Sequence, residues 1–199
     1  MSQDNAVNAT QKIPPPARAA DFSWPDIRTQ SQLRQAVETQ QHGGRVYPVQ
    51  GNKIGEILKS LKVINDKILH AVEMRHLTKK ARDKPTGELL VYMGIIEPEV
   101  LLRALCIQAG VLMVEVQSIH IPFDILKFVS SDNAREKKAI PVHVYNGTLH
   151  LAVADPFNFT DQHFFSFSTG LKINPVFAPS VQIDACISSK WADSETWVG

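Results

Sequence analysis

The chain has 199 residues, 44% of them hydrophobic, so it is long enough to bury a core and is not disordered throughout. Its formal net charge of +1 gives no overall attraction to nucleic acid, and we expect no nucleic-acid partner. The sequence contains no run of about 18 apolar residues, which argues against a transmembrane helix.

Residues 1–49 are predicted to form a disordered or weakly helical tail. The stretch is rich in Gln, Asn, Ala and Pro, and the three prolines at 14–16 favour extended backbone. It lacks the apolar segment of a secretory signal, so we expect a cytoplasmic protein. Residues 31–41 are predicted to form only a transient helix, because their apolar stripe is too narrow to dock firmly: Leu33, Ala36 and Val37.

Residues 50–112 are predicted to form a helical unit from a tandem helix-turn-helix repeat. Apolar residues recur at helical spacing over 54–61 and 64–72, and Asn65 is a candidate N-cap of the second helix. Aligning Lys-Ile-Gly-Glu-Ile-Leu at 53–58 with Pro-Thr-Gly-Glu-Leu-Leu at 85–90 gives an internal repeat with an offset of 32. Deleting one residue from the first copy then places Ile68, Ala71 and Val72 on Leu101, Ala104 and Leu105.

Residues 113–191 are predicted to form a small α/β unit, followed by a C-terminal tail at 192–199. Asn146-Gly147 between two alternating runs predicts a β-hairpin with a type I′ turn. Gly170 is expected to end a helix, and Ser131 or Asp132 to cap one. The expected helices cover 121–129, 133–139, 159–168 and 180–191, and the expected strands cover 140–145, 148–154 and 172–177. This order, ββαβα, predicts a small mixed sheet with helices on one face, and hence an α+β fold.

Three groups of side chains have a structural and a functional interpretation. Cys106 and Cys186 lie in apolar surroundings, which favours buried, reduced thiols over a disulfide. The scattered histidines do not form a metal-binding pattern, and we expect no metal. In the phenylalanine-rich stretch 157–167, Phe164 and Phe167 are predicted to face the sheet, and phenylalanines left exposed would form a protein-docking patch.

The motifs of both units together resemble the N-terminal domain of type II secretion and type IV pilus assembly ATPases, as in general secretory pathway protein E. The resemblance spans about residues 50–191. The helical motif is carried by the runs at 87–90 and 94–96 and by Leu101, Ala104, Leu105 and Gln108, and the α/β motif by the runs at 139–142, 149–156, 169–171 and 175–176.

This resemblance implies a regulatory and docking domain whose partner is an inner-membrane platform component or an ATPase of a secretion or pilus system. It implies a protein that stays in the cytoplasm or lies at the inner membrane through that partner. In one subfamily the domain binds cyclic di-GMP through two motif copies that begin Arg-Leu-Gly and end in Gln. If this chain binds such a ligand, the resemblance implies a site formed by Lys53, Ile54, Gly55, Leu58, Thr86, Gly87, Leu90, Gly94 and Gln108.

The chain departs from the cyclic di-GMP motif at the positions that would hold the ligand. Lys53 and Pro85 replace the two arginines, Lys62 replaces the second glycine of the first copy, and Arg75 replaces its terminal glutamine. Lysine supplies charge without the planar guanidinium that stacks on a base. Protein docking is therefore the leading hypothesis, and a cyclic di-GMP sensor is the alternative.

Two further features bear on function. No G-x-x-x-x-G-K-[ST] run occurs, so we expect neither ATP hydrolysis nor any catalytic residue. Segment 53–84 carries nine basic and four acidic residues, a local excess that could guide an anionic nucleotide. The plainer interpretation is that 78–84 is a solvated linker between the two helical units.

Overall fold

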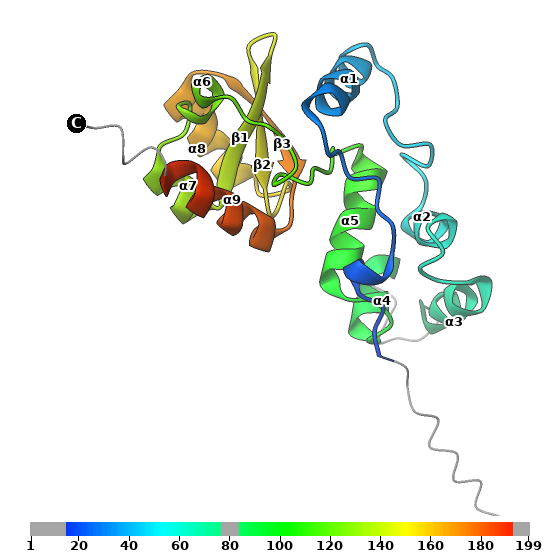
Figure 1. Cartoon of the computed structure of the whole chain (residues 1–199). Coiled ribbons are helices and arrows are strands. Elements are labelled where there is room, and N and C mark those ends of the chain that lie inside the picture. The colour runs from blue at the N-terminus through cyan, green and yellow to red at the C-terminus, as the bar shows by residue number, and fades with distance from the viewer. Residues whose placement is uncertain (1–14, 77–83, 193–199) are drawn as a thin grey trace, which may run out of the picture.

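Two hydrophobic cores organise residues 15–76 and 84–192, which are the residues that the computed structural model describes. One core lies between helices α2 to α5, and the other surrounds a three-stranded sheet. Figure 1 shows the two units side by side, with the sheet and α6 to α9 on one side of the molecule. None of the helices in these ranges is long and apolar enough to cross a membrane.

The helical unit contains α2 (Ile54–Ser60), α3 (Asp66–His76), α4 (Thr86–Tyr92) and α5 (Pro98–Ala109). Asn65 caps α3 as predicted, because its Oδ1 accepts a hydrogen bond of 3.0 Å from the backbone N–H of Ile68. The α5 helix ends at Gly110, whose φ of 75° is the left-handed conformation that glycine adopts without strain.

The sheet has the strand order β1 (Ala139–Tyr145), β2 (Thr148–Val153) and β3 (Lys172–Phe177). The predicted hairpin is confirmed: β1 and β2 are antiparallel, and Asn146 and Gly147 both have positive φ, as a type I′ turn requires. The pairing of β2 with β3 is parallel, so the sheet is mixed. The α+β class predicted from the sequence is therefore confirmed.

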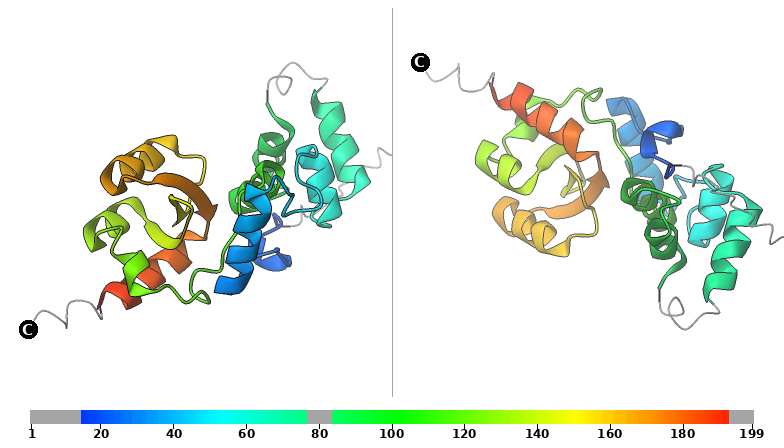
Figure 2. Two further views of the ribbon diagram at one scale, coloured as in Figure 1. Left: turned by 90° about the horizontal axis from the view of Figure 1, so that it is seen from above. Right: turned by 90° about the horizontal axis from the view of Figure 1, so that it is seen from below.

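Helices α6 (Phe123–Leu126), α7 (Ser131–Lys137), α8 (Phe159–Thr169) and α9 (Ser180–Ala192) surround this sheet. The prediction of helices on one face is wrong, because Figure 2 shows α8 and α9 on opposite sides of the strands. The α8 helix connects the parallel strands β2 and β3 across one face, and α9 returns across the other.

Three local predictions in this unit need correction. The helix expected over 121–129 is only one turn long, and the cap of α7 is Ser130, whose Oγ accepts from the N–H of Asn133. In α8, Phe165 is the phenylalanine that faces the core, whereas Phe164 and Phe167 are exposed. The predicted end of α8 at Gly170 is confirmed.

The segment before the helical unit is not a tail over its described part, residues 15–49. It runs along both units: Ala17 forms a parallel bridge with Ile96, and Ile27 forms one with Val114. Helix α1 (Gln30–Gln41) begins at a capping box made by Thr29 and Gln32. All three residues of its narrow apolar stripe are buried: Leu33, Ala36 and Val37.

The docking of α1 corrects the prediction of a transient helix. The helix packs near β1, where Gln30 Nε2 lies 3.2 Å from Nδ1 of His143. The side-chain amide of Asn146 donates to Gln41, so the hairpin turn contacts the other end of the same helix. Residues 1–14 and 193–199 lie outside the described residues, and the domain boundaries at 49, 112 and 191 stay a prediction.

Candidate functional site

The two helix pairs of the helical unit are equivalent in backbone detail. Helix α4 repeats α2 after 32 residues, with the same length and the same three buried positions. The turns match as well, since Val63 N–H donates to Leu58 and Ile95 N–H donates to Leu90. Helices α3 and α5 begin at Asp66 and Pro98, again 32 residues apart, so the repeat needs no deletion.

The predicted one-residue deletion in the first copy is therefore wrong. Val72, predicted to match Leu105, corresponds at offset 32 to Ala104, and both are fully buried. Gln108 corresponds to His76 and not to Arg75. The alignment of the two copies was displaced by one residue because bulky apolar residues stand next to one another in α5. The sequence alone does not show which of these residues faces the core.

Gly55 and Gly87 are the points at which the helices of each pair touch. A Cβ atom built on Gly55 would lie 2.7 Å from Cδ1 of Leu69, and Leu101 stands even closer to the same point on Gly87. A side chain at either glycine would therefore require the leucine of the neighbouring helix to shift. The two glycines thus admit a leucine of the neighbouring helix, which is a packing role that the sequence interpretation did not include.

The remaining predicted ligand residues fall into exposed and buried groups. Lys53 is the exposed N-cap residue of α2 and makes no side-chain capping bond, and Pro85 stands at the same place before α4. Leu58 and Leu90 are fully buried core residues, whereas Ile54 and Thr86 are half-buried.

The predicted second-glycine positions share an unusual backbone conformation. Lys62 has a φ of 59° and Gly94 has a φ of 66°, so both turns are left-handed. The first copy of the repeat has this conformation at a lysine, where it is strained, whereas the second has it at a glycine, where it is not. Gln108 joins the start of the helical unit to α5, because its Nε2 donates to the carbonyl of Asn52 at 2.9 Å. Most of the predicted site residues thus lie in the short helices α2 and α4 or in the turns next to them, and Gln108 lies near the end of α5.

One basic residue of segment 53–84 is paired with two acidic residues of the same segment. Lys59 lies 2.7 Å from Asp66 and 3.6 Å from Glu56. The hydrogen bond to Asp66 and the charge of both carboxylates raise the pKa of Lys59. Residues 78–83 of the predicted linker at 78–84 lie outside the described residues, and Lys84 is exposed.

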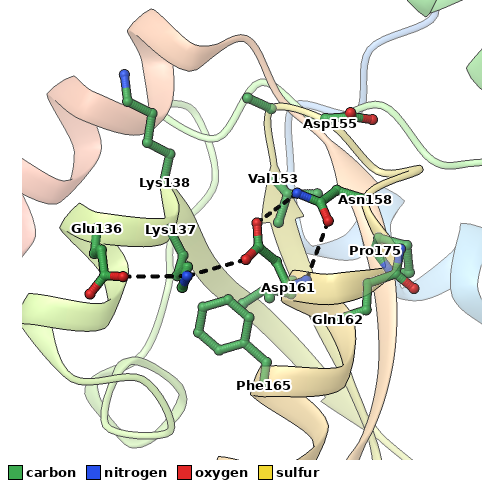
Figure 3. Close-up of a pocket in the computed structure, with 12 residues that line it drawn as sticks. Glu136, Lys137, Lys138, Val153, Asp155, Asn158, Asp161, Gln162, Phe165 and Pro175 are labelled. Atoms are coloured by element: carbon green, nitrogen blue, oxygen red, sulfur yellow. Dashed lines mark hydrogen bonds and ion pairs between the residues drawn. The ribbon is translucent and has the colours of Figure 1, made fainter.

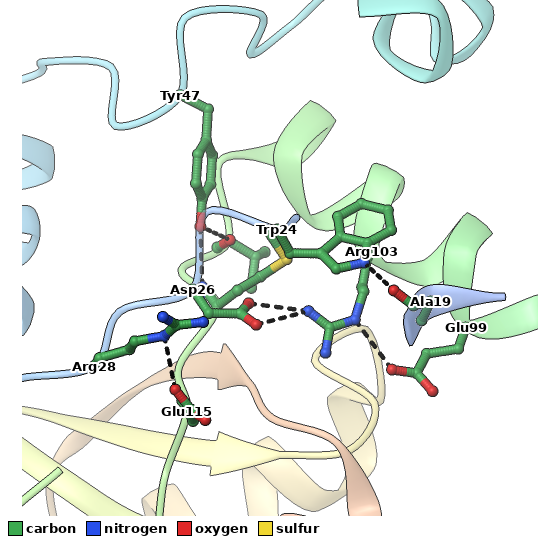
Figure 4. A network of polar contacts seen from close by, with 10 residues as sticks. Ala19, Trp24, Asp26, Arg28, Tyr47, Glu99, Arg103 and Glu115 are labelled. Atoms are coloured by element: carbon green, nitrogen blue, oxygen red, sulfur yellow. Dashed lines mark hydrogen bonds and ion pairs between the residues drawn. The ribbon is translucent and has the colours of Figure 1, made fainter. Parts of the chain in front are cut away.

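Arg103 forms a polar cluster that sequence reasoning missed. Its Nη1 donates to both carboxylate oxygens of Asp26, at 2.9 and 3.1 Å, and its Nε donates to Glu99 at 3.0 Å. The guanidinium also lies between two aromatic rings, 5.3 Å from the Trp24 ring centre and 5.2 Å from that of Phe177. Figure 4 shows how Asp26 and Glu99 meet Arg103 from different parts of the chain.

The Arg103 cluster joins three parts of the fold: the N-terminal segment, α5 and the end of β3. Only the spacing of Glu99 and Arg103, four residues apart on one helix, was visible in the sequence. Tyr47 supports the same junction, since its hydroxyl accepts from the N–H of Met113 and donates to the carbonyl of Val111. Burial raises the pKa of Tyr47.

A pocket of about 310 Å³ lies between α7 and α8 at the end of β2. Figure 3 shows Asp161 pointing toward Lys137 across it. Lys137 lies 3.5 Å from Asp161 and 3.3 Å from Glu136, and the amide of Asn158 donates to Asp161 at 2.8 Å. These polar groups are paired with one another, so we assign the pocket no ligand.

Neither a metal site nor a reactive cysteine emerges from the described residues. No group of three or more metal-ligating side chains occurs in residues 15–76 and 84–192. Cys106 and Cys186 are free and buried, as predicted. Burial raises the pKa of the Cys106 thiol to about 12, which keeps it protonated and unreactive at neutral pH.

Parts of the chain match known proteins. Residues 109–189 match the MshEN domain. The chain is 27% identical over 143 residues to the type IV pilus assembly ATPase PilB of Myxococcus xanthus, a match that covers 71% of this chain and 24% of PilB. The chain thus spans about a quarter of the length of that relative.

Two solved structures match about two thirds of the chain. The structure of MshE with cdg is 19% identical, with a TM-score of 0.48, and the match covers 69% of this chain and 97% of that one. One crystal form of the XpsE N-terminal domain is 20% identical, with a TM-score of 0.41, and the match covers 68% of this chain and 92% of that one.

The predicted resemblance to the N-terminal regulatory domains of secretion and pilus ATPases is confirmed by these matches. Within that class, residues 109–189 match the MshEN domain in particular. The nine predicted ligand residues lie between positions 53 and 108, outside the matched range.

Proposed function

We propose that the chain is a non-catalytic docking and regulatory module that binds a protein partner of a secretion or pilus assembly machine. The observation that supports this most directly is an exposed aromatic pair on the MshEN-matched part. Phe123, on α6, is 69% exposed, and Phe128, just after it, is 37% exposed. Aromatic side chains, phenylalanine included, are enriched in protein interfaces relative to the rest of the surface.

The scaffold below this pair suits docking. Helix α6 is one turn long and packs against β1, so Phe123 projects from a rigid base rather than from a loose loop. Leu126 of the same turn is buried and anchors it in the core. The partner in this proposal is an inner-membrane platform component or the ATPase, and it would bring the module to the cytoplasmic side of the inner membrane.

The module would regulate rather than catalyse. A phosphate-binding loop needs consecutive backbone N–H groups with a lysine and a hydroxyl residue, and the sequence contains no such run. We therefore expect no ATP hydrolysis above background. Turnover that disappears when one residue of this chain is substituted would contradict the proposal.

Calorimetry with purified partners tests the docking. The probes are the cytoplasmic domains of the platform protein and of the ATPase from the same system. Phe123→Asp should weaken binding by roughly tenfold or more, because it places a charge where the aromatic side chain would be buried in the complex. Val181→Asp on α9 is the matched control, since Val181 is 80% exposed and lies on another helix. Equal affinity of wild type and Phe123→Asp would contradict this docking surface.

A cyclic di-GMP sensor is the second candidate, and the precise helical repeat favours it. Two equivalent helix starts, at Lys53 and Pro85, match a ligand with two identical halves. The similarity to MshE, whose structure includes cdg, makes this nucleotide the ligand to test first. Lysine lacks the planar fork that stacks on guanine, so the wild-type affinity should be low.

Titration of cyclic di-GMP into three proteins separates the two candidates. Lys53→Ala should weaken any binding and reduce its salt dependence, whereas the double variant Lys53→Arg with Pro85→Arg should strengthen it. Gly87→Val is not a suitable probe, because its side chain would collide with Leu101 and disturb helix packing. No detectable heat even in the double-arginine variant would exclude the sensor and leave docking.

A further inference from the structure

Two histidines are buried side by side on the sheet. His143 on β1 and His150 on β2 are opposite each other in the strand pairing, and their ring centres are 5.8 Å apart. His143 is 8% exposed and His150 is 1% exposed. The residue opposite His150 on β3 is Asn174, which carries no charge. In the described part of the chain, Nε2 of His143 and Nδ1 of His150 are buried without a hydrogen-bond partner, so this arrangement favours neutral rings.

Helix α1 covers His143 with its N-terminal end. Gln30 is the first residue of the helix, and its Nε2 donates to Nδ1 of His143 at 3.2 Å. An imidazole nitrogen accepts a hydrogen bond only in the neutral ring, because both nitrogens of the cation carry hydrogens. Turning the Gln30 amide would bring its oxygen to the ring, but it would also take Nε2 away from the carbonyl of Val142, at 3.4 Å. This contact between α1 and the sheet therefore depends on a neutral His143.

Most of the charges around the pair oppose its protonation. The N-terminus of a helix carries a partial positive charge, and that of α1 faces His143. On the same helix, Arg34 disfavours a positive charge on His143, whereas Glu38 favours one. A charge on His143 disfavours one on His150, and Tyr145 stacks on His143 as a further titratable side chain. Burial has the largest effect, and it lowers the pKa of both histidines, that of His150 to about 4.

We propose that protonation of His143 and His150 controls the docking of α1 on the β1–β2 hairpin. With neutral rings the helix stays docked. A proton on either ring places an unpaired charge beneath the helix, and α1 then leaves the sheet more often because water must reach that charge. The effect should develop as the pH falls from about 6.5, the ordinary pKa of histidine, toward the lower pKa of His150 in the docked state.

The position of α1 gives this equilibrium a wider consequence. Gln40 donates to the carbonyl of Gly110 at the end of α5, and Gln41 accepts from Asn146 in the hairpin turn. Figures 1 and 2 show α1 between the hairpin and the helical unit. Weaker docking of α1 would loosen this connection, so acidification would change how the two units are held together. This inference goes beyond the proposed function, and it uses no residue of the docking surface at Phe123.

Thiol labelling of the full chain carrying Ala36→Cys tests the proposal. Ala36 lies on the buried face of α1, so a thiol there reacts only when the helix leaves the sheet. From pH 7 to pH 5, its labelling by dithiodipyridine, relative to the same thiol in urea-unfolded protein, should become roughly tenfold faster. The buried Cys106 and Cys186 report global unfolding and should stay unlabelled on that time scale. An unchanged relative rate, or native cysteines that react as fast as the introduced thiol, would overturn the proposal.

Variants in this background identify the groups that bind the protons. His143→Gln combined with His150→Leu removes both titrating rings, and the relative labelling rate should then no longer depend on pH. Gln30→Glu should reduce the pH effect, because its carboxylate pairs with protonated His143. His120→Gln is the matched control, since His120 is exposed and its replacement should leave the effect unchanged. A pH effect that persists without both buried rings, or one that His120→Gln removes, would overturn the proposal.

Discussion

Replacing Arg103 by Met should destabilise the described fold by up to about 3–5 kcal/mol, because it leaves the largely buried carboxylate of Asp26 without its partner. Arg103 is only 5% exposed and its partner Asp26 has a side chain that is 17% exposed, so water cannot replace the lost charge effectively. Methionine retains part of the packing between Trp24 and Phe177, and the measured change will therefore report mainly the lost ionic contacts.

Urea unfolding followed by both tryptophan fluorescence and circular dichroism measures this cost. Adding Asp26→Asn to Arg103→Met should recover part of it, since the uncompensated charge is then removed. Arg28→Met is the matched control: Arg28 forms a 2.8 Å ion pair with Glu115, but its side chain is 67% exposed. That variant should cost about 0–1 kcal/mol.

The reasoning would be refuted if Arg103→Met cost no more than Arg28→Met. It would also be refuted if Asp26→Asn made the Arg103→Met variant less stable. Either result would mean that the Arg103 cluster is solvated and does not join the N-terminal segment to the two units.

Two further predictions concern stability. Burial lowers the pKa of His150 to about 4, so between pH 4 and the unfolded value near 6.5 the unfolded state binds more protons, and stability rises with pH in that window. The free energy of unfolding should therefore be about 2 kcal/mol lower at pH 5 than at pH 7. The His150→Leu variant should show a smaller difference between the two pH values. Equal stability of the wild type at pH 5 and pH 7 would contradict this prediction. Gly87→Ala should cost up to about 1 kcal/mol by thermal denaturation, because its Cβ forces the side chain of Leu101 to shift, and Gly55→Ala should cost less, since Leu69 stands farther away. A Gly87→Ala variant more stable than the wild type would contradict this packing role.

Local chemistry in the sequence was sufficient for several elements. Asn146-Gly147 determined a type I′ hairpin, because these two residues tolerate positive φ better than others do. Asn65 determined the start of α3 in the same way, through a side chain that reaches the N–H three residues later. The repeat at Gly55 and Gly87 was visible because helix packing imposes the same small residue at the same place twice.

Other features depended on contacts between distant parts of the chain, which no local pattern encodes. Helix α1 has an apolar stripe too narrow to predict docking, yet the hairpin supplies a matching surface and buries Leu33 and Val37 completely. The face of α8 that packs against the sheet is the one that carries Phe165, which is buried in the core. The sequence did not show which face this is, because four phenylalanines occur within nine residues. Arg103 and Asp26 are 77 residues apart, and only the tertiary fold brings their charges together, because burial and ion pairing depend on distance in space and not along the chain.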